Sequence, residues 1–187
     1  LAVHNGKATV LEVQRAPAIH VGRSGGLFSS DGKSTALYAG SSIVGRGNRA
    51  ATAMLFDGER AAAIKNPNPE QAKLGSGWNT EYMMTLFNIG VPVDSPVAIA
   101  FGQGIYLAVA RKAYSGKPSD RNLLLGSRLT TAGIRLDAAS AWPVLHDSPH
   151  RIANPALAGG EGHFMLAFEQ EDAGGRRHIW AKSLRVK

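Results

Sequence analysis

Short apolar runs that lead into and out of glycine turns dominate the pattern along this chain. The three clearest copies lie at residues 53–58, 97–104 and 155–162, and apolar runs follow them at 60–64, 105–110 and 163–168. Runs of this length between glycines predict β-hairpins rather than helices. A pattern that returns after tens of residues predicts stacked units that share one continuous core.

The copies align as units of four strands. One unit places strands at 52–56, 60–65, 81–87 and 91–94, and the next places them at 96–101, 105–111, 122–129 and 134–137. Gly90 and Asp94 recur as Gly133 and Asp137 at the same spacing, which favours a structural role for both aspartates at turns. A further unit begins at Pro155 and reaches only a third strand, near the last residues.

The first fifty residues are less regular. Asn5-Gly6 and Asp31-Gly32 are turn dipeptides, and each precedes an apolar or threonine-rich run. We expect two further hairpins there.

The units resemble the repeats of secreted bacterial β-propellers. The runs at 105–110 and 163–168 are similar to the second strand of a blade, and the resemblance covers about residues 50–187. It implies an all-β chain of four-stranded antiparallel blades, forming a single unit over 1–187 with approximate blades 1–50, 51–95, 96–153 and 154–187. A single β-sandwich or barrel is the alternative.

The number of four-strand units indicates whether the chain can close a propeller ring by itself. Propellers close with 4–8 blades, and about three and a half units fit in 187 residues. We therefore expect an incomplete ring that another polypeptide chain, or a second copy of this one, completes. Because the chain starts at Leu1 rather than methionine, we expect a processed or excised piece, and the resemblance implies an extracellular or periplasmic location.

The amino-acid composition argues against several classes of function. The net charge is +7, but the basic residues are spread along the chain rather than gathered in a stripe with aromatic residues, which argues against nucleic acid as a partner. No apolar run approaches the ~20 residues of a membrane span. The chain has no cysteine, which excludes disulfides and thiolate metal sites.

Candidate binding residues lie in the expected loops. Loops at 66–79 and 114–121 would face a ligand, and Trp78 and Trp142 are candidate stacking platforms for sugars, whereas Trp180 lies in a predicted strand and is expected in the core. The candidate ligand-binding residues are Trp78, Trp142, Asn79, Asp120 and Arg121.

The other clusters of polar residues are weaker candidates for a functional site. His146, Asp147 and His150 have a spacing that would suit a metal on a helix, but Pro149 breaks that helix, so a polar loop between units is favoured over a metal site. Residues 169–172 are expected to form a solvated loop, no cofactor is implied, and no catalytic residue can be named. The sequence favours a non-catalytic binding or assembly module. The alternative is a carbohydrate-active hydrolase of the sialidase or glycosidase kind. A glycan is the candidate small ligand.

Overall fold

The protein is an all-β chain in a computed structural model that describes residues 2–4, 7–9, 27–44, 48–60, 62–68, 81–87, 93–112, 121–137 and 142–185. These residues form fourteen strands and no helix. Accordingly, no helix in this part of the chain is long and apolar enough to cross a bilayer.

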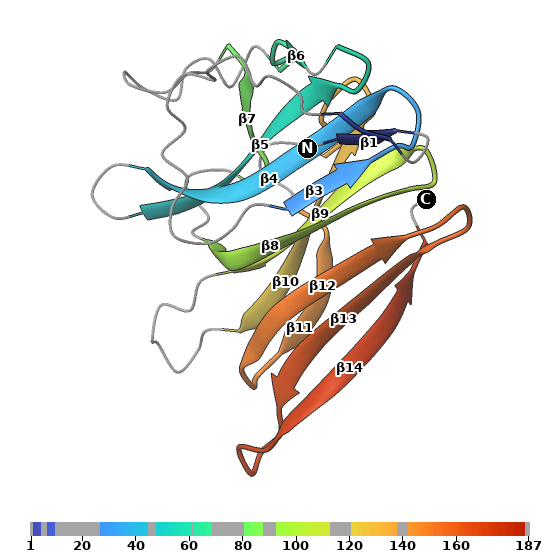
Figure 1. Cartoon of the computed structure of the whole chain (residues 1–187). Coiled ribbons are helices and arrows are strands. Elements are labelled where there is room, and N and C mark those ends of the chain that lie inside the picture. Colours follow the sequence, from blue (N-terminus) through green and yellow to red (C-terminus); the bar gives the residue numbers. More distant parts are fainter. Residues whose placement is uncertain are drawn as a thin grey trace.

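Three antiparallel sheets follow one another along the chain (Figure 1). Sheet I contains β3 (Leu27–Ser30), β4 (Thr35–Val44), β5 (Asn48–Asp57), β6 (Ala62–Ala63) and β7 (Met83–Thr85), with β6 and β7 both paired to β5. Sheet II contains β8 (Val93–Gly102), β9 (Ile105–Lys112), β10 (Asn122–Thr130) and β11 (Val144–Ser148). Sheet III contains β12 (Ile152–Gly159), β13 (Phe164–Glu171) and β14 (Arg177–Leu184).

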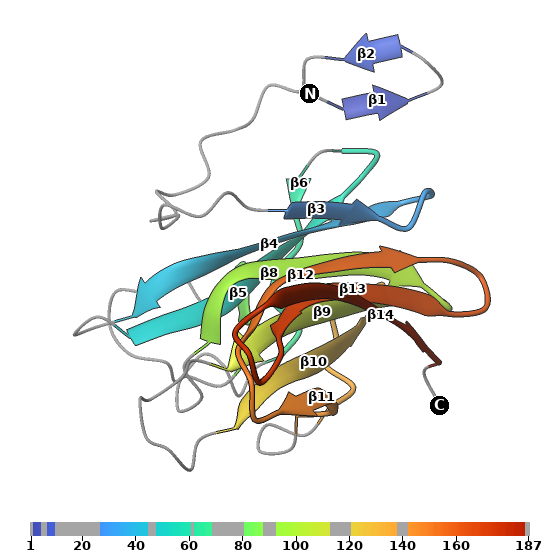
Figure 2. The same ribbon diagram turned by 90° about the horizontal axis from the view of Figure 1, so that it is seen from below.

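The two hairpins expected in the first fifty residues are confirmed. β1 (Ala2–His4) pairs with β2 (Lys7–Thr9) across Asn5-Gly6, and β3 pairs with β4 across the Asp31 turn. The β1–β2 hairpin stands apart from the three sheets in Figure 2. In the β3–β4 turn, Asp31 Oδ1 accepts backbone hydrogen bonds from Lys33, Ser34 and Thr35 at 2.9–3.0 Å.

Sheets II and III repeat one plan. Each begins with a strand that contains a proline at an irregularity in the pairing, Pro96 in β8 and Pro155 in β12. Each first strand then returns through a glycine turn into a long second strand. In sheet II the turn is Gln103-Gly104, whose φ angles of 53° and 76° are both positive, as a two-residue type I′ hairpin requires.

Sheet II lies between sheets I and III, and the innermost strands β3, β8 and β12 are neighbours (Figure 1). One apolar cluster fills the space between sheets I and II, with Leu37 and Leu55 facing Ile99 and Tyr106. A second fills the space between sheets II and III, with Leu107 and Val109 facing Phe164, Leu166 and Phe168. The result is an arc of stacked sheets, not one sandwich or barrel.

The strand order differs from the sequence prediction in three places. The stretch 134–137 pairs with β10 only through one bridge, Leu129 to Arg135, and the fourth strand of sheet II is β11. Asp94 is not at the end of a unit but in β8, opposite Arg111.

The expected first strand of the second unit is also placed differently. It belongs to β5, which pairs with β4 over ten positions, so the predicted boundary between residues 50 and 51 falls inside this strand. A glycine turn after an apolar run predicts a hairpin but not the position of each strand within its sheet. The hairpins were therefore predicted correctly, whereas the positions of the strands within the sheets were not.

Candidate functional site

One end of sheets II and III gathers charged and polar side chains. Antiparallel pairing places the starts of β8, β10, β12 and β14 beside the ends of β9, β11 and β13 at this end. We call it the polar end; its residues are Arg111, Arg121, His146, Asp147, Arg151, Glu169, Glu171 and Arg177. The opposite end carries the glycine turns that join β8 to β9 and β12 to β13.

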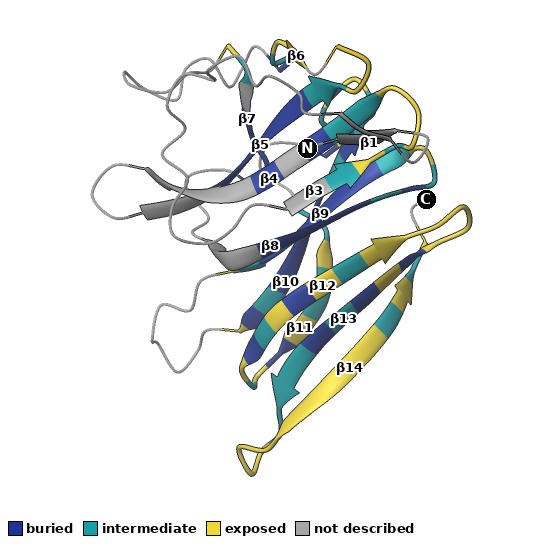
Figure 3. Cartoon of the chain, in the orientation of Figure 1, coloured by how far each residue is buried: buried dark blue, intermediate teal, exposed yellow. Residues whose placement is uncertain are grey.

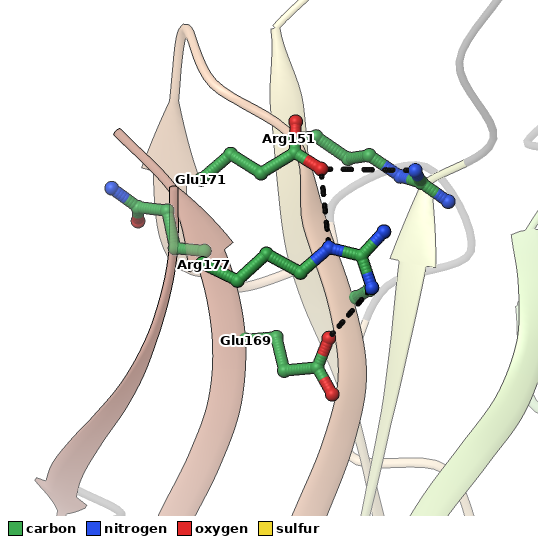
Figure 4. A pocket seen from close by; sticks show the side chains of 6 residues that line it. Arg151, Glu169, Glu171 and Arg177 are labelled. Carbon is green, nitrogen blue, oxygen red and sulfur yellow. Dashed lines mark ion pairs between the residues drawn. The ribbon is translucent and has the colours of Figure 1, made fainter. Parts of the chain in front are cut away.

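Four of these residues form an ionic cluster on the face of sheet III that is turned away from sheet II (Figure 4). Glu171 Oε1 lies 3.7 Å from Arg151 Nη1 and 3.5 Å from Arg177 Nε. Arg177 also reaches Glu169, with Nη1 3.9 Å from Oε2. One guanidinium thus bridges two carboxylates, and a second approaches from the start of β12.

The cluster borders a shallow hollow. Its lining consists of Arg151, Ala153, Glu169, Gln170, Glu171 and Arg177, and its interior volume is about 10 Å³. Asn154, at the irregularity in β12, donates a hydrogen bond of 2.9 Å to Glu169 Oε1. A volume of about 10 Å³ holds about one water molecule, so a sugar ring would contact the rim of this hollow rather than enter it.

Strand periodicity explains why the cluster forms. Glu169 and Glu171 are two residues apart in β13, so both point to the same face. The hairpin at Asp172 then brings Arg177 directly opposite Glu171. The expectation that 169–172 form a loop is wrong, because the strand continues to Glu171.

The Asp172 turn fixes this register. Asp172 Oδ1 accepts hydrogen bonds from the backbone N–H groups of Gly174 and Arg176 at 2.8 and 2.9 Å, and Gly175 has a φ of 76°. His178 Nε2 lies 3.0 Å from Asp172 Oδ2, and this hydrogen bond, together with those from the backbone, lowers the pKa of Asp172.

Sheet II contributes a second, more exposed ion pair at the polar end. Arg121 Nε lies 2.7 Å from Asp147 Oδ1, and this hydrogen bond raises the pKa of Arg121. Arg111 Nη1 donates to the backbone oxygen of Ile152 at 2.8 Å, which ties sheet II to the start of β12. Arg121 is thus the one predicted ligand-binding residue, among those the structure describes, that lies at this end.

The predicted metal candidates are separated. His146 and Asp147 lie in β11 rather than in a loop; His146 Nε2 is 2.6 Å from Gln170 Oε1 and its ring packs on Phe168. The backbone N–H of His150 bonds to Ser148. No group of three or more metal-ligating side chains occurs in the part of the chain that the structure describes.

The tryptophans are placed differently from the expectation. Trp142 packs beside Phe87, with ring centroids 5.3 Å apart, and the Arg135 guanidinium lies 4.6 Å from its ring centre, so one ring face is covered. Trp180, expected in the core, is 48% exposed on the outer strand β14. Trp78, Asn79 and Asp120 lie outside the described residues.

Asp137 has the structural role that the repeat predicted. Its carboxylate is 3% exposed, accepts a hydrogen bond from the backbone N–H of Arg128 at 2.7 Å and pairs with the Arg128 guanidinium at 2.7 Å. These bonds hold the stretch 134–137 against the last part of β10, whereas β11 pairs with the first part of the same strand.

Comparison with known proteins shows the fold. No protein-family model and no curated protein matches the sequence. The structure is similar to the α-L-arabinanase of Cellvibrio cellulosa in complex with arabinohexaose, with a TM-score of 0.51 and 10% identity over 87% of this chain and 53% of that chain. It also matches the arabinanase Arb43A of Bacillus subtilis, with a TM-score of 0.45 and 10% identity over 84% of this chain and 52% of that one.

This chain therefore spans about half the length of the solved structures it matches. The predicted fold class is confirmed: the three sheets are β-propeller blades in an open, incomplete ring.

Proposed function

We propose that this chain is a glycan-binding section of a carbohydrate-active β-propeller and that the ionic cluster of sheet III contacts the sugar. The structural likeness to an arabinanase that was solved with arabinohexaose supports a carbohydrate ligand. The observation that carries the proposal is the convergence of two carboxylates and two guanidinium groups on one hollow at the polar end.

The cluster has the chemistry that sugar hydroxyls need. A hydroxyl both donates and accepts, so neighbouring hydroxyls on a sugar ring suit a site with both kinds of partner. Glu169 and Glu171 accept, and Arg151 and Arg177 donate. The ion pairs of 3.5–3.9 Å are longer than good charge-assisted hydrogen bonds of about 2.7–2.9 Å, so hydroxyls placed between these groups would improve their contacts.

The same carboxylates are the candidates for hydrolysis. Residues two apart in a strand lie about 7 Å apart, which is within the roughly 6.5–9.5 Å that inverting glycosidases use. Both carboxylates face arginines, however, which suits hydrogen bonding to a sugar better than donation of a proton to a leaving group. Binding is therefore the activity that this geometry supports best.

The test is a titration with arabinohexaose, followed by calorimetry and by amide NMR shifts at β13 and β14. Loss of one charged hydrogen-bond partner in Glu169→Gln should weaken binding about tenfold or more. The matched control is Glu161→Gln, an exposed glutamate in the β12–β13 turn at the other end of the sheet, which should bind as the unaltered chain does.

Two results would count against the proposal. Absence of binding to arabinohexaose and to a panel of other oligosaccharides removes the glycan ligand. Equal affinity of the Glu169 and Glu161 variants moves the ligand away from the hollow. Release of reducing ends that Glu169→Gln abolishes would instead identify the hydrolase alternative.

A glycan-binding role is compatible with the extracellular or periplasmic location that the sequence resemblance implies. Fractionation of the producing cell checks this location.

A further inference from the structure

The outer edge of β14 has no partner strand among the residues that the structure describes. β14 pairs with β13 over eight positions along one edge, and no described strand pairs with the other edge. Ile179 is 82% exposed and Trp180 is 48% exposed, on opposite faces of this strand, which contains no proline (Figure 3). Such an edge presents a row of unpaired backbone N–H and C=O groups, which is a template for a further strand.

Sheet II has a strand that is equivalent to β14. Residues 98–110 align with 156–168 without a gap, because both contain the same glycine turn, so Leu107 corresponds to Met165. β10 pairs with β9 as β14 pairs with β13, in an antiparallel register. β10 is therefore the counterpart of β14, and the two registers match each residue of one strand to a residue of the other.

The outer edge of β10 is covered, whereas that of β14 is not. β11 pairs with the first part of β10, and the stretch 134–137 lies against its last part. β10 is accordingly mostly buried, while every residue of β14 is exposed or half-buried. In the described part of sheet III, no strand takes the place that β11 has in sheet II.

An ion pair of sheet II indicates the chemistry that such a strand needs. Asp147 of β11 pairs with Arg121, just before β10, at 2.7 Å. The registers match Leu124 to Ile179, so the counterpart of Arg121 is Arg176. Arg176 is exposed, and no carboxylate in the described part of the chain pairs with its guanidinium. An added strand that carries a carboxylate at the position of Asp147 would supply this partner.

The charge around β14 argues against a second copy of the same strand as the occupant. Residues 173–187 contain five lysines and arginines and no aspartate or glutamate. Two β14 strands paired edge to edge would bring these cations together, and like charges on neighbouring strands are destabilising. The edge therefore suits a strand that carries negative charge.

We propose that the outer edge of β14 binds an extended segment of a partner polypeptide, which adds a fourth, antiparallel strand to sheet III. Backbone hydrogen bonds along the edge supply the affinity. The recognition element is an aspartate or glutamate opposite His178, because Asp147 lies opposite the equivalent residue Leu123 in sheet II. From this position the carboxylate reaches Arg176 and fixes the register. The docking does not depend on the glycan-binding function.

The probe is a synthetic peptide with the sequence of residues 142–150, which contains β11 and takes this place in sheet II. Titrated into the full chain, it should slow amide hydrogen exchange at alternate residues of β14 at least about tenfold, because their N–H groups become hydrogen-bonded. Unchanged exchange along β14 at millimolar peptide overturns the proposal. Slowing confined to β10 would place the peptide at sheet II and overturns it as well.

Backbone methylation of the probe tests whether a strand is added. Two peptides, N-methylated at either the odd or the even positions of the β11 segment, lose the N–H groups of one edge each. One of them should bind about tenfold or more weakly, and the other should bind as the unmodified peptide does, because only one edge of a strand faces β14. Equal affinity of the two peptides would mean that side chains alone hold the probe, and overturns strand addition.

A charge exchange tests the carboxylate. Arg176→Glu should weaken binding of the peptide about fivefold, and a peptide with lysine in place of the aspartate should restore it. Arg185→Glu is the matched control, because Arg185 is also exposed but lies beyond the other end of β14, and it should keep the preference for aspartate. Identical behaviour of the two variants overturns the assignment of Arg176.

Two further results separate the alternatives. A chain that dimerises at high concentration and protects β14 without the peptide would show that two β14 edges meet, which overturns the partner strand. A chain that binds the peptide at β14 but no oligosaccharide contradicts the glycan-binding function alone, whereas one that binds arabinohexaose at Glu169 but not the peptide contradicts the docking alone.

Discussion

Sheets II and III have the same strand plan but opposite surroundings. Sheet II is covered on both faces, and five successive residues of its second strand, from Tyr106 to Ala110, are buried. Sheet III is covered on one face, so in β13 Phe164, Leu166 and Phe168 are buried while Met165 between them is exposed (Figure 3). Position in the stack, rather than strand composition, decides the burial of each side chain.

The sequences of the two strands do not show this difference. Residues 105–110 and 164–168 are both continuous apolar runs. Continuous runs are typical of strands buried on both faces, whereas strands with one solvated face usually alternate apolar and polar residues. β13 therefore has the sequence of an internal blade strand, although the described residues cover only one of its faces.

The largest effect should come from shortening equivalent side chains in the two sheets. Leu107→Ala leaves a cavity between sheets II and III and should cost about 3 kcal/mol of unfolding free energy. Met165→Ala, at the equivalent position, should cost less than about 1 kcal/mol in the monomer, because the side chain is partly exposed. Urea denaturation of dilute samples measures both. Equal losses would break the distinction between a covered and an open sheet.

A smaller effect is expected where the two sheets touch at the turn end. A Cβ on Gly159 would overlap the backbone oxygen of Phe101, so Gly159→Ala must push β12 away from β8 and should cost about 2 kcal/mol. Gly162→Ala is the matched control in the same turn, because a Cβ there meets no atom within 4 Å. Thermal unfolding of the pair measures the difference. An unchanged Gly159→Ala variant would show that sheet III is not held close to β8.

The smallest effect concerns the Asp172 turn, which is exposed and has no counterpart in the described part of sheet II. Hydrogen bonds from His178 and the backbone lower the pKa of Asp172, so its ionised form stabilises the folded state. This contribution is present above the unfolded pKa of about 3.9 and is lost as the pH falls through the lower folded value. Asp172→Asn should therefore be less stable than the unaltered chain at pH near 6, and the difference should shrink as the pH falls below about 3.9. Urea titrations over a series of pH values from about 6 downward check this, and a difference that does not shrink in acid would be at odds with it.

Much of the fold was predictable because hairpins are local. Glycine turns such as Gln103-Gly104 need positive φ angles, and the apolar runs beside them must pair, so the all-β class and the repeat of sheets follow from neighbouring residues. The rank of a strand within its sheet was not predictable. β5 and Asp94 were misplaced because pairing with β4 or β9 depends on residues outside the hairpin.

The site was less predictable than the fold. The spacing of Glu169 and Glu171 would place both on one face of a strand, and a turn at Asp172 with its two glycines would place Arg177 opposite them. We nevertheless expected residues 169–172 to form a solvated loop, because the stretch is polar throughout. Among the predicted loop residues that the structure describes, Arg121 alone lies at the polar end. Trp142 instead supports the packing of sheets I and II, because Arg135 and Phe87 lie against its ring.

The sequence by itself determined the hairpins, their alternation and the apolar character of both faces of β9 and β13, since these depend on local backbone preference and side-chain period. Only the tertiary structure decided which of those faces are covered and which charged groups meet. Stacking buries Leu107 and leaves Met165 exposed, and hairpin register brings Arg177 to Glu169 and Glu171. Both outcomes depend on neighbouring sheets and strands, which a local pattern does not contain.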